Sequence, residues 1–210
     1  MQVTRNGYLV IIGWIALYAT ITVVYFLTQF HSDDVLVRFF ALFGITSLLN
    51  AAIMSAFTRQ LYKNLGVAFL KLHHLFAIAG LVLITLHPVA LTFIRGLQVF
   101  IPDFSSWYTF WSLAGRPALY IAYVGVVSVL LRKLLKKHWR IVHALLYIAL
   151  IFGVVHGVLL GQDHANPLID GIYIGLLALM MLAFIYKRYF AYLQAQKRKT
   201  SQNKEMVSTS

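Results

Sequence analysis

Six stretches of the chain are long and apolar enough to cross a lipid bilayer as α-helices. They cover residues 8–29, 36–57, 67–94, 116–135, 141–161 and 168–186. The hydrocarbon core of a bilayer is about 30 Å thick, so each crossing needs roughly 20 apolar residues. A composition with 60% hydrophobic and 11% charged residues also excludes an ordinary soluble domain. We therefore predict an all-α fold, an integral membrane bundle of six helices.

The apolar stretches follow one another closely, which favours a single membrane domain over residues 1–190. Residues 191–210 form a polar cytoplasmic tail that ends in QKRKTSQNKEMVSTS, and its polar composition predicts disorder toward the end. The longest connection, 95–115, is rich in aromatic and turn residues and is expected to lie on the membrane surface. The first stretch is too long and too aromatic for a cleavable signal sequence, so we expect it to stay as a helix.

Basic residues are distributed unevenly between the two sides of the predicted bundle. With the N-terminus in the cytoplasm, fifteen of the eighteen lysine and arginine residues fall on the cytoplasmic side and five of the six acidic residues on the other. Cytoplasmic loops of membrane proteins carry such an excess of basic residues. We expect both termini in the cytoplasm and a multi-pass protein of the cell inner membrane. The net charge of +12 then reflects topology and attraction to anionic membrane lipid, with no nucleic acid as partner.

Histidines occur inside two of the apolar stretches, where polar side chains are costly and need a reason. The third stretch contains His73, His74 and His87, and the fifth contains His143 and His156. Both stretches run outward from the cytoplasmic side, which places one set of histidines near the inner leaflet and one near the outer leaflet. Because the chain has no cysteine, a bound metal would depend mainly on these imidazoles.

Helical geometry relates the two levels. Fourteen residues separate His73 from His87, which corresponds to about 21 Å along a helix and returns to within about 40° of the same face. The two histidines of the fifth stretch are thirteen residues apart, about 19.5 Å, but about 140° away from the starting face. The fifth helix therefore needs a kink, a bulge or a rotated ligand, and Gly153 and Gly157 are the candidate positions for it.

Two imidazoles at each of two levels suit a haem iron, which takes two axial ligands. Two haems at two depths allow an electron to cross a barrier that an ion cannot. A structural zinc site takes four ligands, whereas levels about 20 Å apart leave two at each. An interhelical hydrogen bond explains a single intramembrane histidine, but four at matching depths favour a cofactor. The alternative class is a transporter or channel in which the histidines form a relay for protons or metal ions.

The stretch LHHLFAIAGLVLITLH resembles the third transmembrane segment of the ferric reductase-like transmembrane domain family. That family includes ferric reductases, NADPH oxidases and the haem-binding membrane subunit of the periplasmic methionine sulfoxide reductase system. Its third segment has a His, usually followed by a basic residue, and a second His fourteen positions after the first. The stretch KHWRIVHALLYIALIFGVVH is similar to its fifth segment, in which a Trp precedes a His by four residues and another His follows thirteen later. The similarity covers about 40–186.

The resemblance implies two haem b groups as cofactors. His73 and His143 would hold the inner haem iron, and His87 and His156 the outer one. His74 stands where the family usually has Arg or Lys, so the inner ligand is either His73 or His74. The fourteen-residue spacing favours His73.

Arg116 is the remaining candidate for cofactor binding. It opens the fourth apolar stretch at the outer face, within AGRPAL. A lone arginine beside a proline at a helix start either caps the helix or extends toward the headgroups. It is equally suited to bind a haem propionate. No residue is assigned a catalytic role.

The chain departs from the family because no flavin- and nicotinamide-binding module follows the sixth stretch, and no Gly-rich dinucleotide fingerprint is present. It resembles the stand-alone members, which implies a haem-carrying membrane subunit of an oxidoreductase. Such electron-transport subunits depend on a separate cytoplasmic flavin reductase or flavoprotein donor, and some bind FMN or FAD. The acceptor at the outer face would be ferric iron, a quinone, oxygen or a periplasmic reductase such as methionine sulfoxide reductase. A basic patch on the cytoplasmic side is suited to steering an acidic donor: Arg132, Lys133, Lys136, Lys137 and Arg140.

Overall fold

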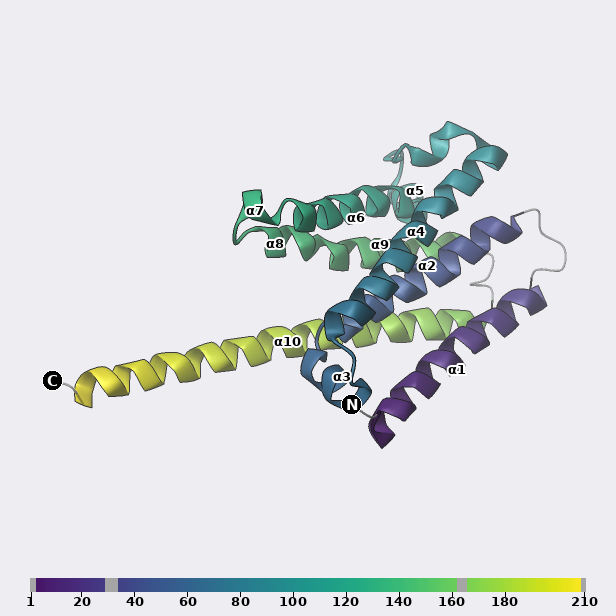
Figure 1. Ribbon diagram of the computed structural model, residues 1–210. Coiled ribbons are helices and arrows are strands. Elements are labelled where there is room, and N and C mark those ends of the chain that lie inside the picture. The colour runs from purple at the N-terminus through teal and green to yellow at the C-terminus, as the bar shows by residue number, and fades with distance from the viewer. Residues whose placement is uncertain (1–2, 29–33, 162–165, 209–210) are drawn as a thin grey trace.

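The computed structural model describes residues 3–28, 34–161 and 166–208, and the regular elements in these ranges are helices (Figure 1). The long helices cross one another at moderate angles, and short helices occupy the turns between them. In chain order the elements are α1 (Arg5–Thr28), α2 (Val35–Met54), α3 (Thr58–Leu65), α4 (Phe69–Arg95), the 3₁₀ helix η1 (Leu97–Phe100), α5 (Trp107–Ser112), α6 (Gly115–Leu130), α7 (Arg132–Leu135), α8 (Trp139–His143), α9 (Leu145–Leu160) and α10 (Pro167–Ser208).

Five helical segments among the described residues are long and apolar enough to cross a membrane. They are α1, α2, α4, the segment Trp139–Leu160 that contains α8 and α9, and α10. The fourth predicted crossing, 116–135, differs because α6 ends at Leu130 and has only 16 residues, which is about 24 Å of helix. The all-α, multi-pass prediction is thus supported, and a sixth crossing stays a prediction.

Helices α2 and α4 pack with their backbones close together at two glycines. A Cβ atom on Gly44 would lie 2.9 Å from the backbone nitrogen of Ile84. A Cβ atom on Gly80 would lie 3.0 Å from the carbonyl oxygen of Gly44. Membrane helices use small residues in this way to approach one another closely, so this crossing holds α4 at a fixed position against α2.

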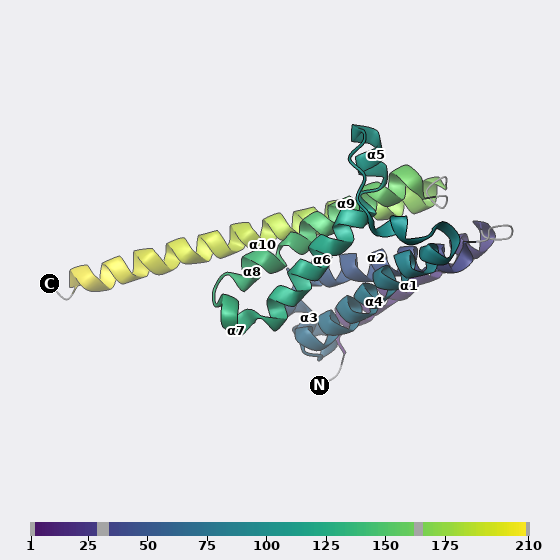
Figure 2. The same ribbon diagram turned by 90° about the horizontal axis from the view of Figure 1, so that it is seen from above.

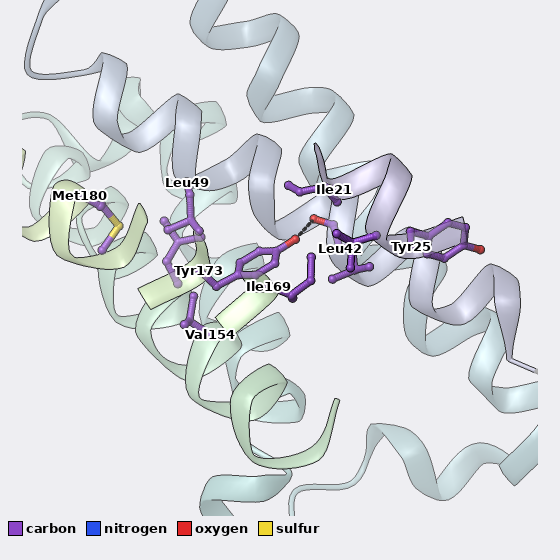
Figure 3. Packing of buried hydrophobic residues seen from close by; sticks show 10 residues of the cluster. Ile21, Tyr25, Leu42, Leu49, Val154, Ile169, Tyr173 and Met180 are labelled. Carbon is purple, nitrogen blue, oxygen red and sulfur yellow. Dashed lines mark hydrogen bonds between the residues drawn. The ribbon is translucent and has the colours of Figure 1, made fainter. Parts of the chain in front are cut away.

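The largest buried cluster joins α1, α2, α9 and α10 around Tyr173 (Figure 3). The hydroxyl of Tyr173 donates to the carbonyl oxygen of Leu42 at 2.8 Å and lies 2.9 Å from the hydroxyl of Thr46. The ring of Tyr173 is 1% exposed, and Ile21 and Leu49 around it are completely buried. Because its polar atom has partners, this tyrosine can be buried without an unsatisfied group.

The basic turns of the chain gather at one end of the bundle. Figures 1 and 2 both show the start of α1, helix α3 and the turn between α7 and α8 at the end toward which α10 projects. The backbone N–H of Thr4 donates to the carbonyl oxygen of Asn64 at 2.9 Å, which fixes the start of the chain against α3. Helices η1 and α5 lie toward the opposite end.

Helix α10 corrects the expectation of a disordered end to the tail. It is continuous over 42 residues to Ser208, about 63 Å of helix, and projects far beyond the bundle (Figure 1). The chain beyond Gly175 has no glycine or proline and is rich in Ala, Leu, Gln and Lys, which favour helix. An existing apolar helix also removes the cost of nucleation, so the polar residues extend it.

Two connections contain short helices. Helix α3 lies in the turn between α2 and α4 and buries Leu61 and Leu65 against Met54, with Arg59 and Lys63 exposed. The 95–115 connection contains η1 and α5, and the side chains of its apolar residues are largely exposed, which agrees with a position at the membrane surface: Leu97, Ile101, Phe104, Trp107 and Tyr108.

Candidate functional site

The outer two histidines face one another across the bundle. His87 lies on α4 and His156 on α9, and their ring centroids are 6.4 Å apart with the ring planes inclined at 67°. A metal–imidazole bond is about 2 Å long, so two imidazoles on opposite sides of one metal ion have centroids roughly 6 Å apart. The separation of these rings therefore matches that of two axial ligands of one metal.

The inner two histidines occupy equivalent positions at the other end of the same helices. His73 lies in the second turn of α4, and His143 is the last residue of α8. Phe69 packs against the ring of His73, with centroids 5.2 Å apart, and Trp139 against that of His143 at 6.2 Å. Aromatic rings thus flank the inner pair.

Each of the four histidines uses its Nδ1 atom for a hydrogen bond to a backbone carbonyl oxygen. Since a carbonyl only accepts hydrogen bonds, each Nδ1 carries the proton and each neutral ring has its lone pair on Nε2. Metal-binding histidines are oriented by this kind of bond. The four bonds are His73 to Ala51 at 3.2 Å, His87 to Val37 at 2.9 Å, His143 to Gly125 at 3.1 Å and His156 to Ser112 at 2.6 Å.

The acceptors have the same spacing as the histidines that they bind. On α2, Ala51 and Val37 are fourteen residues apart, as are the two histidines on α4. Ser112 at the end of α5 and Gly125 on α6 are thirteen residues apart, as are the two histidines of α8 and α9. Each pair of histidines is therefore held in register by one preceding antiparallel segment, once at each level.

Helix ends explain why some of these carbonyls are available. The N–H of Ser55 donates to Ala52 at 3.1 Å, one residue short of the α-helical partner, which leaves the Ala51 carbonyl for His73. Ser112 is the last residue of α5, where carbonyl groups lack intrahelical donors. The Gly125 carbonyl also accepts from the Ser128 hydroxyl at 2.7 Å, since an oxygen atom has two lone pairs.

An interruption between α8 and α9 brings His143 and His156, which are thirteen residues apart, closer to one face of this segment. The break lies at Ala144, between α8 and α9, and the N–H of Tyr147 donates to the Ala144 carbonyl three residues earlier. Such tight turns advance by about 120° per residue instead of about 100°, which rotates His143 relative to α9. The expected position at Gly153 or Gly157 is wrong, because both glycines lie inside the continuous helix α9.

Two glycines on α6 leave room beside the ligand helices. A Cβ atom on Gly115 would lie 2.6 Å from Cδ2 and 2.9 Å from Nε2 of His156. A Cβ atom on Gly125 would lie 2.9 Å from the side chain of Leu146 and 3.6 Å from the carbonyl oxygen of His143. The His156 ring therefore packs directly against the start of α6, at a position where the residue has no side chain.

The structure separates the two candidates for the inner ligand. The His74 side chain is exposed, whereas that of His73 is partly buried and bound to α2. The ring centroids of the two residues are 6.0 Å apart, so they point to different surroundings. The position of His73 matches that of the other three histidines.

Arg116 binds the outer connection. Its Nη1 atom donates to the carbonyl oxygen of Ile101 at 2.6 Å, and the Tyr120 hydroxyl donates to that of Phe100 at 3.0 Å. Hydrogen bonds from Ser105, together with the charge of Arg116, hold the pKa of the Asp103 carboxyl below its usual value. In this structure Arg116 therefore ties the connection to the start of α6.

Sequence reasoning missed the groups that position the rings. The four acceptors are main-chain atoms, which any residue supplies, so no sequence signal identifies them. Ser128 is 2% exposed. Its hydroxyl donates to the carbonyl oxygen of Gly125 at 2.7 Å and to that of Trp139 at 3.2 Å. Arg38, next to the acceptor Val37 on α2, is only 8% exposed, and the sequence shows only that this arginine stands in an apolar stretch.

Among the described residues, no three His, Asp or Glu side chains gather into a metal-binding cluster. The arrangement instead offers two imidazoles at each of two levels. Comparison with protein-family models, with curated proteins and with solved structures gives no match.

Proposed function

We propose that this chain is a transmembrane electron-transfer protein that holds two haem b groups, the membrane subunit of a two-component oxidoreductase. His73 and His143 hold the inner iron, and His87 and His156 the outer one. A cytoplasmic flavoprotein supplies the electrons, and an acceptor at the outer face takes them up. The proposal includes six crossings of the cell inner membrane, with both termini in the cytoplasm.

The observation that carries the proposal is the common geometry of the four rings. Every Nδ1 atom is occupied by a backbone carbonyl, so every Nε2 atom keeps a lone pair. The centroid separation of 6.4 Å between His87 and His156 suits two axial ligands. Gly115 allows the His156 ring to pack closely against the start of α6. Two histidines at each level are the number of protein ligands that a haem iron takes.

The protein's own contribution is to fix the ligands and exclude water. When bound, haem supplies reversible one-electron chemistry at its iron, with a potential that the axial ligands and burial adjust. The carbonyl bonds hold the imidazoles at two depths about 21 Å apart by helical rise. Apolar residues of α2, α4, α6 and α9 separate the two levels, so an electron can pass where water and ions do not.

The six-crossing topology is supported by the arrangement of the turns. The start of α1, helix α3 and the α7–α8 turn, all of which carry basic residues, lie at the end toward which α10 projects (Figure 2). Helix α6 would cross with help from the flanking helices α5 and α7. This distribution agrees with the positive-inside rule.

A proton or metal-ion channel is the second candidate, because intramembrane histidines also serve as relays. A relay needs a continuous series of polar groups between the two levels. Here Gly80 lies halfway between the two histidines of α4, and its neighbours there are the side chain of Leu48 and the backbone of Gly44. The close contact of α2 and α4 at this point favours the electron conduit.

Proteoliposomes distinguish the two functions. Purified protein, expressed with sufficient haem, is reconstituted with ferricyanide inside the vesicles and dithionite outside. The proposal predicts that the entrapped ferricyanide is reduced, and that His87→Ala abolishes this while His138→Ala, at an exposed histidine, does not. Vesicles loaded with a pH-sensitive dye serve as the second arm. Proton movement without a redox couple, combined with no reduction of ferricyanide, would replace the proposal with the channel.

A further inference from the structure

Three polar side chains from different parts of the chain form a hydrogen-bonded series at the inner end of the bundle. The Lys187 ammonium group on α10 donates to the Ser55 hydroxyl at 3.3 Å. That hydroxyl lies 3.1 Å from the hydroxyl of Tyr147 on α9. Ser55 directly follows α2, so three transmembrane helices meet at these groups.

This series lies beside the inner pair of histidines. Ser55 follows Ala51, the acceptor of the His73 ring, by one helical turn. Tyr147 follows His143 by one turn across the break in the fifth segment. Because Lys187 donates to Ser55, its ammonium group lies near the residue that follows the His73 acceptor by one turn.

Aromatic packing against Phe57, the residue before α3, fixes the position of Lys187. The rings of Phe57 and Tyr186 stack with centroids 6.1 Å apart, and Tyr186 stacks on Phe190 at 6.0 Å. These contacts turn the adjacent lysine toward Ser55. Its neighbour Arg188 instead lies over the ring of Phe184 at 5.3 Å, so the two consecutive cations face different surroundings.

No carboxylate among the described residues pairs with Lys187. Along α10 the acidic residues are Asp170 and Glu205, which are about 25 Å and 27 Å away by helical rise. Asp34 and Asp103 belong to the opposite end of the bundle. A cation at the end of a membrane segment is stabilised by an anion, and the part of the chain that the structure describes places no carboxylate beside this one.

We propose that Lys187, Ser55 and Tyr147 form a binding site for an anionic oxygen group, namely a carboxylate of the cofactor held by His73 and His143. The ammonium group has protons beyond the one that it donates to Ser55, and the bond between the two hydroxyls uses only one of their two protons, so donors remain for an anion. The assignment of the bound carboxylate to the cofactor rests on the function proposed above. A phosphate of an anionic lipid headgroup has the same chemistry and does not depend on that function.

The test compares Lys187→Met with Arg188→Met, which removes the same charge one residue away, and with the conservative variant Lys187→Arg. Each change is made in the full chain and also in a His156→Ala background, which keeps only the inner pair. Midpoint potentials are measured by redox titration. Phospholipid that remains bound after purification in detergent is measured by mass spectrometry.

A carboxylate at this site predicts that Lys187→Met lowers the midpoint potential of the inner haem, because the negative charge of the propionate is then uncompensated and stabilises the more positive oxidised form. Lys187→Arg should restore the potential, and Arg188→Met should not change it. Loss of bound anionic lipid with unchanged potentials would assign the same site to a lipid phosphate. If Lys187→Met alters neither quantity relative to Arg188→Met, the anion site is refuted. If the parent contains no haem, the function proposed above fails, and the lipid measurement alone decides on the site.

Discussion

The two ring nitrogens of each intramembrane histidine have different surroundings. One nitrogen is bound to a main-chain carbonyl, and this bond fixes the tautomer as well as the direction of the ring. In the neutral ring the other nitrogen, Nε2, carries the lone pair through which a histidine binds a metal. The same arrangement occurs at His73, His87, His143 and His156, so the four residues are best understood as two equivalent pairs.

Loss of one outer histidine should remove one haem. We expect His87→Ala or His156→Ala to lower the haem content by about half, because the inner pair is held by its own carbonyls about 20 Å away. The pyridine haemochromogen assay measures this directly. His74→Ala should retain more haem than His73→Ala, since His74 is exposed. Complete loss of haem in every single variant would indicate one site or collapse of the bundle.

Gly115 should control the orientation of the outer ligand. In Gly115→Ala the new methyl group would meet the His156 ring at 2.6 Å, so the ring has to rotate away from its carbonyl partner. We expect loss or spectral change of the outer haem with the inner haem retained, as measured by low-temperature absorption spectra. Gly13→Ala on α1 is the matched control, since a Cβ atom there has no neighbour within 4 Å. Identical spectra for both variants would contradict this role.

At the level of helices, the ligand-bearing segments are each paired with a preceding segment that supplies the acceptors. Helix α4 pairs with α2, and the α8–α9 segment pairs with α5 and α6. Close approach at glycines makes this possible, because a ring on one helix can then reach a carbonyl oxygen on the next. The distance between the two sites is therefore set by main-chain geometry.

The α2–α4 crossing should tolerate no added side chain at its centre. The Cβ atom of Gly80→Ala would lie 2.7 Å from the Leu48 side chain and 3.0 Å from the carbonyl oxygen of Gly44. Overpacking of this kind costs about 1–3 kcal/mol, so the unfolding temperature in detergent should fall. Gly13→Ala serves again as the control and should not lower it. An unchanged unfolding temperature for Gly80→Ala would show that the two helices can separate without cost.

Part of this architecture could be predicted from the sequence. Hydropathy identified the apolar helices, and histidine spacing indicated two levels of rings. The family resemblance implied the pairing of His87 with His156, whose rings lie 6.4 Å apart in the structure. The break at Ala144 could not be predicted, because alanine gives no signal for a tight turn, whereas Gly153 and Gly157 do. The helical conformation of the chain beyond Gln196 was not predicted, because a polar composition indicates contact with water but does not specify the backbone conformation. The acceptors escaped detection because every residue has a carbonyl group.

For the whole molecule, one end of the bundle concentrates exposed positive charge. The basic patch around the α7–α8 turn is exposed throughout, and Lys136 in that turn has a positive φ of 47°, which directs the chain sharply back. This end also contains His143. A negatively charged donor protein would therefore meet the bundle close to the inner site.

Removing charge from this patch should slow the donor without affecting haem content. We expect Lys136→Gln with Lys137→Gln to lower the rate of reduction by an added flavin reductase by roughly an order of magnitude at low ionic strength. The effect should vanish at high salt, which screens such steering. Arg59→Gln with Lys63→Gln removes equal charge from exposed positions on α3 and should have little effect. Equal rates for both double variants in stopped-flow experiments would remove the docking role.

The central claim is that four histidines hold two haems in one polypeptide, and the haem-to-protein ratio tests it most directly. We predict two non-covalent haem b groups per chain in monodisperse protein expressed with sufficient haem. Their low-spin ferric electron paramagnetic resonance signals should be typical of two imidazole ligands. Replacing all four histidines by alanine should abolish these signals. A folded, monodisperse parent protein without haem, or a fourfold variant that retains it, would contradict the account.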